Sequence, residues 1–137
     1  MYTLILLLTI ASPPPANQYQ LRLERVLDGD TIEADIMLGF DVTLDDQSIR
    51  LQGFDAWEVS RRRRTVTVTD DELAKGAIAK KELTELLATH KGRIYLRPAK
   101  EGRGVYGRVV GYLVIYTKDG DIIDVDKWMK GRGHARE

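Results

Sequence analysis

Residues 19–54 read YQLRLERVLDGDTIEADIMLGFDVTLDDQSIRLQGF, and the spacing of their apolar side chains decides the fold class. Tyr19, Leu21 and Leu23 alternate with polar residues, which is typical of a strand with one buried face. Three further stretches have strand character, at residues 31–37, 40–44 and 49–54. Turn-forming sequences separate them, namely DGD at 28–30, LG at 38–39 and DDQS at 45–48. The region therefore predicts a succession of short strands.

One long helix is predicted after this region, following a basic segment at 56–69 that we interpret as a loop. Asp70 or Asp71 can cap the helix, which runs to about residue 90, before Gly92. Its apolar stripe consists of Leu73, Ala77, Leu83, Leu86 and Leu87. A stripe of this width predicts that one side of the helix packs against the strands.

The remainder of the chain predicts more strands and a short helix. A strand at 93–97 ends at Pro98, a polar turn covers 100–104, and a long strand covers 106–116. A hairpin turn at 118–121 precedes a final short helix capped by Asp124. About five strands around one principal helix favour a small closed barrel over a sandwich, because closure removes exposed strand edges. The predicted class is mainly β with helices (α+β).

Length and composition indicate one ordinary globular domain. The chain has 137 residues, of which 43% are hydrophobic, and its 21 basic and 21 acidic residues cancel. The charges are nevertheless segregated, with seven acidic and no basic residues at 28–46, and six basic residues against one acidic at 91–108. Such segregation could hold a cation and a phosphate together, but on charge alone ordinary solvated surface faces are the favoured explanation.

The absence of cysteine excludes disulfides, thiolate metal sites and cysteine nucleophiles. With two histidines in the chain, a histidine-based zinc site is not expected either. Any metal would therefore be held by oxygen atoms.

The first residues, MYTLILLLTIASPPPANQ, contain no charged side chain. Their apolar run at 4–11 is too short to span a bilayer and resembles a secretory signal cleaved after Ala11. No basic residue precedes that run, so an unstructured start is the alternative. We interpret residues 1–17 as a signal peptide or Pro-rich leader and residues 18–137 as the folded domain. Cleavage would give a secreted or periplasmic protein without stable membrane association, and the alternative is a cytoplasmic one.

Three charged motifs are the candidates for a functional site. The first, DGDT at 28–31, lies where a predicted strand bends, and by itself it indicates only a turn. The second, RLQGFDAWE at 50–58, surrounds a strand end with Arg50, Asp55 and Glu58. Arg50 and Asp55 would face opposite sides of a straight strand, so a shared site requires a bulge or turn near Gly53. The third, YGR at 106–108, is by itself a strand start with a surface arginine.

Together these motifs resemble the thermonuclease family, also called staphylococcal-nuclease-like. The matching pieces are VLDGDTIEA at 26–34, RLQGFDAWE at 50–58, the helix from Asp71, VYGRVVGYL at 105–113 and WMKGRGHA at 128–135. The resemblance implies a five-stranded OB-fold barrel and a Ca²⁺-dependent nuclease. Such an enzyme hydrolyses phosphodiester bonds of DNA, RNA or both with little sequence preference, and we expect it to be a monomer.

The resemblance also implies a role for each matching residue. The carboxylates of Asp30 and Asp55 would bind Ca²⁺, and the backbone carbonyl of Ala56 would add a ligand. The sequence departs from the family at Ala56-Trp57, where Thr-Pro is common. A backbone ligand survives the loss of threonine, whereas the loss of proline loosens the loop. Trp57 could stack on a base or take part in packing.

Catalysis and substrate binding are implied for the remaining residues of the motifs. Arg50 and Arg108 would hold the scissile phosphate, and Glu58 would act as general base for the attacking water. Tyr106 would lie beside the 5′ nucleotide. The basic run would grip the nucleic-acid strand, and it consists of Arg61, Arg62, Arg63 and Arg64. The alternatives are a catalytically weak or inactive member that binds nucleic acid or protein, and an unrelated barrel that serves as an interaction module.

Overall fold

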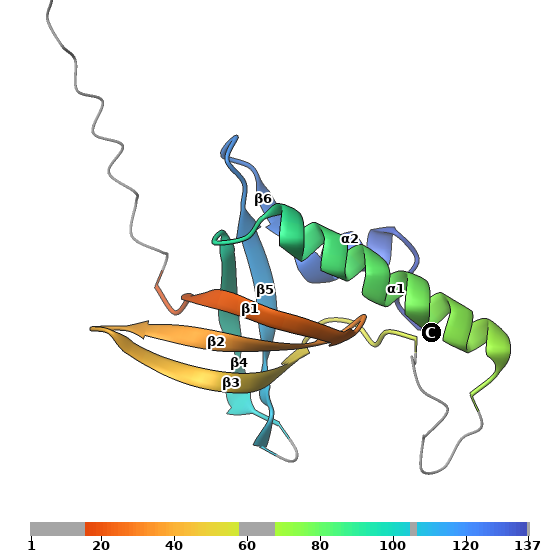
Figure 1. Ribbon diagram of the computed structural model, residues 1–137, viewed down its shortest axis with the longest axis horizontal. Helices are drawn as coiled ribbons and strands as arrows, with labels where there is room; N and C mark the ends of the chain where they lie inside the picture. Colours follow the sequence, from red (N-terminus) through yellow and green to blue (C-terminus); the bar gives the residue numbers. More distant parts are fainter. Residues whose placement is uncertain (1–15, 58–67, 105–106, 137) are drawn as a thin grey trace, which may run out of the picture.

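The computed structural model describes residues 16–57, 68–104 and 107–136 (Figure 1). Within these residues, six strands and two helices follow one another. They are β1 (Tyr19–Asp28), β2 (Thr31–Gly39), β3 (Val42–Leu51), α1 (Asp70–Thr89), β4 (Ile94–Arg103), β5 (Val109–Tyr116), β6 (Ile122–Asp124) and α2 (Val125–Gly131). Neither helix in these ranges combines the length and apolar character that crossing a membrane requires.

Five of the strands close into an OB-like barrel. The sheet has the order β3-β2-β1-β4-β5-β6, and a parallel pairing between β3 and β5 joins its two sides. In that pairing Ile49, Arg50 and Leu51 lie opposite Val109, Val110 and Gly111. β6 extends the sheet beyond β5 as an additional antiparallel strand. The predicted fold, mainly β with helices and a closed five-stranded barrel of OB type, is confirmed.

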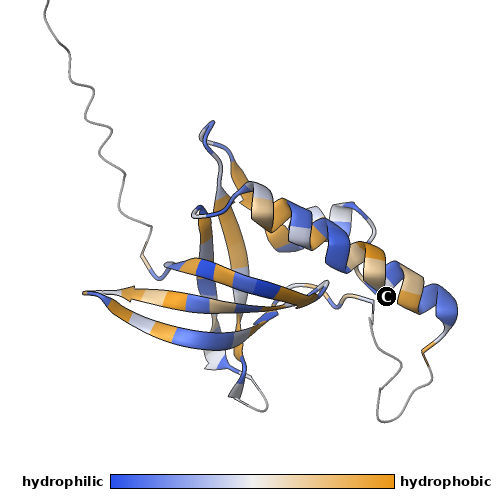
Figure 2. Ribbon diagram, in the orientation of Figure 1, coloured by the Kyte–Doolittle hydropathy of each residue, from blue (hydrophilic) through white to orange (hydrophobic). Residues whose placement is uncertain are grey.

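The core lies inside the barrel and under α1. Alternation along β2 and β3 places Ile32, Ala34 and Ile49 inside, each with no exposed surface. Figure 2 shows apolar and polar residues alternating along β1 to β3, whereas β5 is apolar over most of its length. From α1, Leu83 and Leu87 complete this core, as the predicted stripe requires. The stripe is wrong at Ala77, which is exposed, because Gly76 and Ala79 are the residues that face the core there.

The helix cap differs from the prediction by one residue. Thr69 caps α1, with its hydroxyl accepting from the amide of Glu72, while the Glu72 carboxylate accepts from the amide of Thr69. This reciprocal pair is a capping box. Asp70 and Asp71 instead occupy the first turn, where negative charge favours the positive end of the helix dipole.

Two predicted turns are parts of strands. Residues 45–48 belong to β3, which accommodates them with a register shift and with Asp46 at φ +55°. Asparagine and aspartate tolerate this left-handed conformation better than most residues, so the DDQS sequence forms a bulge. Similarly, β4 continues through Pro98 and covers residues 100–103. Pro98 lies opposite Gly111 at the start of another irregularity, where a strand can dispense with one amide donor.

Candidate active site

The turn between β1 and β2 places Asp30 at one end of the barrel. The amide of Asp30 donates to Asp28 Oδ1 over 2.9 Å, and the carbonyl of Asp30 accepts from the amide of Leu51 over 2.7 Å. Gly29 has no side chain, which leaves room for the residues that pack against the turn. A Cβ atom at Gly29 would lie 2.8 Å from the Cβ of Ala56 and 2.9 Å from that of Ala79. The glycine therefore lets the turn, the segment after β3 and α1 pack against one another.

Asp30 is a buried carboxylate, with 2% of its surface exposed. Its Oδ2 atom accepts from the amide of Ala56 over 2.7 Å and forms an ion pair with Arg50, and its Oδ1 atom accepts from the hydroxyl of Thr31. Burial raises the pKa of Asp30 to about 7, together with the hydrogen bond and charge of Asp28, against the opposing effects of Ala56 and Arg50.

Arg50 joins the first two motifs. One terminal nitrogen of its guanidinium pairs with Asp30, and the other, Nη2, donates to Asp55 Oδ1 over 2.8 Å. Hydrogen bonds and attraction from Asp55 and Asp30 outweigh burial and raise the pKa of Arg50 above its ordinary value. Gly53, at φ +99°, provides the turn that brings Asp55 back to the side of Arg50. The structure therefore brings three of the predicted site residues together.

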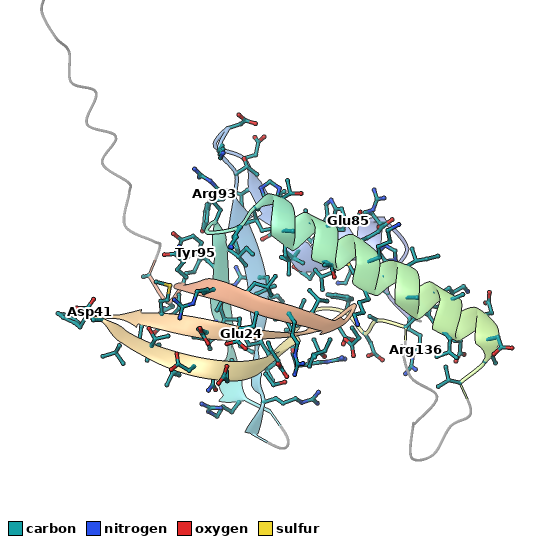
Figure 3. The ribbon with its side chains drawn as sticks, viewed as in Figure 1. Glu24, Asp41, Glu85, Arg93, Tyr95 and Arg136 are labelled. Carbon is teal, nitrogen blue, oxygen red and sulfur yellow. The ribbon has the colours of Figure 1, made fainter. Side chains whose placement is uncertain are left out.

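A fourth residue of this group, Arg136, was not predicted. Its Nη2 atom lies 3.2 Å from Asp55 Oδ2, and its amide donates to the carbonyl of Asp55 over 2.6 Å. Next to it, Ala135 forms an antiparallel bridge with Ala56. In Figure 3, Arg136 lies near α1, at the end of the chain that meets the segment following β3. We call Asp30, Arg50, Asp55 and Arg136 the arginine-bridged site.

The segment that carries Arg136, residues 132–136, is termed the C-terminal arm. Glu82 of α1 anchors it, accepting from Arg132 Nε over 2.6 Å and lying 2.5 Å from His134 Nε2. The side chain of His134 is buried, and its amide donates to the carbonyl of Met129. Hydrogen bonds from Arg132 and His134 lower the pKa of Glu82 to about 2. The arm is thus held at two places, on α1 and on Asp55-Ala56.

Arg108 is exposed, and within the described ranges it has no ion pair. It precedes β5 directly, two residues before Val110, the partner of Arg50 in the parallel pairing. Extending the alternation of β5 back by one residue puts Arg108 on the same outer face as Arg50. The other predicted residues lie outside the described ranges: Glu58, Arg61, Arg62, Arg63, Arg64 and Tyr106.

Ala56 and Trp57 follow directly on Asp55. Ala56 is buried, and its carbonyl accepts no backbone hydrogen bond from any residue of the described ranges. That carbonyl is therefore compatible with a ligand role. The ring of Trp57 lies 4.6 Å from Lys75 Nζ of α1, which is a cation–π contact. The sequence is compatible with two roles for Trp57, stacking on a base or taking part in packing. The contact with Lys75 is of the second kind.

A second acidic group lies elsewhere on the barrel. Glu24, Asp35 and Asp46 each place a carboxylate oxygen within 4.8 Å of the others. Asp35 accepts from Arg22 Nη2 over 2.7 Å and from the amide of Asp46 over 2.9 Å. Hydrogen bonds with Asp46 and Asp35 raise the pKa of Glu24 to about 7. We call these three residues the outer acidic cluster; Figure 3 shows Glu24 well apart from Arg136.

Comparison of the chain with protein-family models and with curated proteins found no match. The resemblance to thermonucleases therefore depends on the sequence motifs alone.

Proposed function

We propose that this protein is a Ca²⁺-dependent nuclease that hydrolyses phosphodiester bonds of DNA, RNA or both with little sequence preference. The observation that carries the proposal is the guanidinium of Arg50, held between the carboxylates of Asp30 and Asp55. An anion-binding fork and two oxygen ligands for a hard cation thus share one small region. A surface salt bridge, the simpler interpretation of the second motif, does not require a carboxylate as buried as that of Asp30.

The donors at this position suit calcium. Asp30 and Asp55 supply carboxylate oxygens and Ala56 supplies a carbonyl oxygen, and Ca²⁺ accepts such hard ligands in irregular geometry. When bound, the ion polarises a phosphoryl oxygen and lowers the pKa of nearby water. The same ion would compensate the repulsion between carboxylates that Arg50 now compensates.

The chain's own residues would bind and orient the substrate. Arg50 presents a planar pair of N–H donors that matches two phosphate oxygens, and Arg108 would add a second such pair from the same face. These donors stabilise the negative charge that develops on the phosphate oxygens in the transition state. Glu58 would orient the attacking water and accept its proton. Tyr106 and the arginines at 61–64 would contact the neighbouring nucleotides.

One observation favours an alternative, a catalytically weak or inactive domain that binds nucleic acid or protein. Both carboxylate oxygens of Asp55 are paired with arginine side chains, so the arginine-bridged site forms a connected ion-pair network without a cation. Such a network could have a structural role alone.

A digestion assay separates the two functions. Labelled single-stranded DNA or RNA is incubated with the purified protein in Ca²⁺, in EGTA and in EGTA followed by excess Ca²⁺. We expect cleavage in Ca²⁺, none in EGTA and recovery after re-addition. Cleavage that continues undiminished in EGTA contradicts the metal mechanism. Binding of nucleic acid without cleavage at any Ca²⁺ concentration favours the alternative.

A matched pair of arginine variants tests the site itself. Arg50→Ala should lower the cleavage rate by about 100- to 1,000-fold, the usual cost of removing an electrostatic donor to the transition state. Arg25→Ala removes a comparable arginine–carboxylate pair, with Glu33, on the exposed surface of the barrel. It should leave the rate unchanged. Equal rates in the two variants would remove Arg50 from the mechanism, and circular dichroism checks that both fold.

A further inference from the structure

The side chain of Arg136 pairs with the second carboxylate oxygen of Asp55. Arg50 takes Oδ1 of this carboxylate and Arg136 takes Oδ2. A cation that binds Asp55 must therefore compete with two guanidinium groups for the same oxygens. Because the second guanidinium comes from the C-terminal arm, cation binding at Asp55 is coupled to the position of the Arg136 side chain.

The main chain of Arg136 is held independently of its side chain. The amide of Arg136 bonds to the carbonyl of Asp55, the bridge between Ala135 and Ala56 lies next to it, and His134 fastens the arm to Glu82. None of these contacts involves the guanidinium group of Arg136. The side chain of Arg136 is also accessible, since 26% of its surface is exposed, against 28% for Arg50. Arg136 can therefore change partner without detachment of the arm.

The chemistry of the guanidinium group indicates what the second partner would be. The arginine-bridged site contains two carboxylates, of Asp30 and Asp55, and two guanidinium groups, of Arg50 and Arg136, so the charges of these four side chains cancel when all are ionised. A divalent cation bound to the carboxylates adds two positive charges, which favours the binding of an anion. An arginine released from Asp55 at this point has a phosphate as its natural acceptor.

We propose that Arg136 is a phosphate-binding residue of the arginine-bridged site. Asp55 holds its side chain until a divalent cation takes that carboxylate, and Arg136 then pairs with a phosphodiester group of the substrate. The inference rests on the proposed function for the identity of the ligand, a nucleic-acid phosphate. It adds a third arginine, from the C-terminal arm, to the two predicted from the motifs.

Two equilibrium measurements on the full chain test this inference without turnover. Calcium alone is titrated by calorimetry, and a fluorescein-labelled oligothymidylate with phosphorothioate linkages, which resist cleavage, is titrated by fluorescence anisotropy in Ca²⁺ and in EGTA. Arg136→Gln should bind Ca²⁺ more tightly, by about fivefold, because one nearby positive charge is removed. In Ca²⁺ it should bind the oligonucleotide about 10- to 100-fold more weakly, the value of charge-assisted hydrogen bonds to phosphate. In EGTA the two proteins should bind it equally.

The opposite signs of these changes are the decisive feature. If Arg136 only positions the Asp55 loop, its loss should lower the affinity for both Ca²⁺ and the oligonucleotide. Weaker Ca²⁺ binding by Arg136→Gln, or unchanged oligonucleotide binding in Ca²⁺, would overturn the inference. Arg136→Lys keeps the charge but not the planar fork, so it should leave Ca²⁺ binding near that of the wild type and recover part of the oligonucleotide affinity. Arg132→Gln removes a charge from the arm outside the site. It should not combine tighter Ca²⁺ binding with weaker oligonucleotide binding.

The failure of this inference can be distinguished from that of the proposed function. In one outcome, the wild type does not cleave nucleic acid, while Arg136→Gln binds Ca²⁺ more tightly and the oligonucleotide more weakly. That result would contradict the proposed nuclease activity and support the phosphate-binding role of Arg136. If the wild type cleaves in Ca²⁺ and Arg136→Gln binds both ligands as the wild type does, the role of Arg136 fails alone.

Discussion

Two groups of acidic residues on the same barrel have different environments. The outer acidic cluster contains three carboxylates close together on the exterior of β1, β2 and β3, with Arg22 as its cationic partner on Asp35. The arginine-bridged site has two carboxylates, and Arg50 lies between them. Each group contains one buried carboxylate that is paired with an arginine, Asp35 with Arg22 and Asp30 with Arg50. The two groups differ because Arg50 bridges two carboxylates, whereas the outer acidic cluster brings three carboxylates together.

The two groups also arise in different ways. Irregular pairing between β1 and β2 and between β2 and β3 gathers Glu24 and Asp46 around Asp35. These strands are consecutive, so two local bulges suffice. The arginine-bridged site instead requires the β1–β2 turn, the segment after β3 and the C-terminal arm to meet. Figure 1 shows the chain's end beside that segment and α1. A site assembled from distant segments is more sensitive to packing than one built on neighbouring strands.

The largest expected difference between the groups is in catalysis. Asp30→Asn removes a proposed calcium ligand, so Ca²⁺ affinity should fall by at least about 10- to 100-fold, the loss typical of even a supporting group. Cleavage should fall with it. Asp35→Asn, in the outer acidic cluster, should leave both unchanged while lowering stability, because its buried carboxylate accepts from Arg22 and Asp46. Calorimetry, the digestion assay and urea unfolding measure these effects. A larger loss of calcium affinity in Asp35→Asn than in Asp30→Asn would indicate that calcium binds at the outer acidic cluster.

An intermediate effect is expected on packing at the arginine-bridged site. Gly29→Ala introduces a Cβ that would lie 2.8 Å from Ala56 Cβ and 2.9 Å from Ala79 Cβ. Overpacking of this kind costs about 1–3 kcal/mol of unfolding free energy. Gly131→Ala is the matched control, since a Cβ there meets nothing within 4 Å. Urea unfolding compares the two. A Gly29→Ala protein as stable as the control would show that the three segments are less closely packed than described.

The smallest expected effect is a pH dependence in the outer acidic cluster. The pKa of Glu24 is raised from 4.5 to about 7 in the folded protein, so between these values the folded state binds more protons than the unfolded state. Stability should therefore decrease as the pH rises from about 4.5 through 7. Glu24→Gln removes this dependence, so its stability relative to the wild type should be greater at pH 8 than at pH 5. Thermal unfolding at the two pH values measures the difference. If the stability difference between Glu24→Gln and the wild type were the same at pH 5 and pH 8, the pKa of Glu24 would not be raised in the folded protein.

The sequence predicted much of the arginine-bridged site but not its assembly. Asp30, Arg50 and Asp55 were identified from the first two motifs, and the need for a turn at Gly53 followed from strand alternation. Arg136 could not be found in this way. Its contact with Asp55 depends on a backbone bridge between Ala56 and Ala135, and two alanines carry no side-chain signal for such pairing. His134 of the motif at 128–135 holds the arm on Glu82, but its burial is seen only in the structure.

Local sequence determined the elements of this protein, because alternation, helical spacing and turn residues act over a few positions. It thereby determined the barrel class and the approximate position of the strands, although the stretches predicted at 40–44 and 49–54 contribute to one strand, β3. Where it was wrong, at residues 45–48 and at Pro98, bulged strands accommodated residues that otherwise favour turns. Only the tertiary structure decided that β3 pairs with β5, and that Arg50 and Arg136 meet on Asp55. These contacts depend on which distant segments pack together, which is set by burial of the whole core rather than by any one segment.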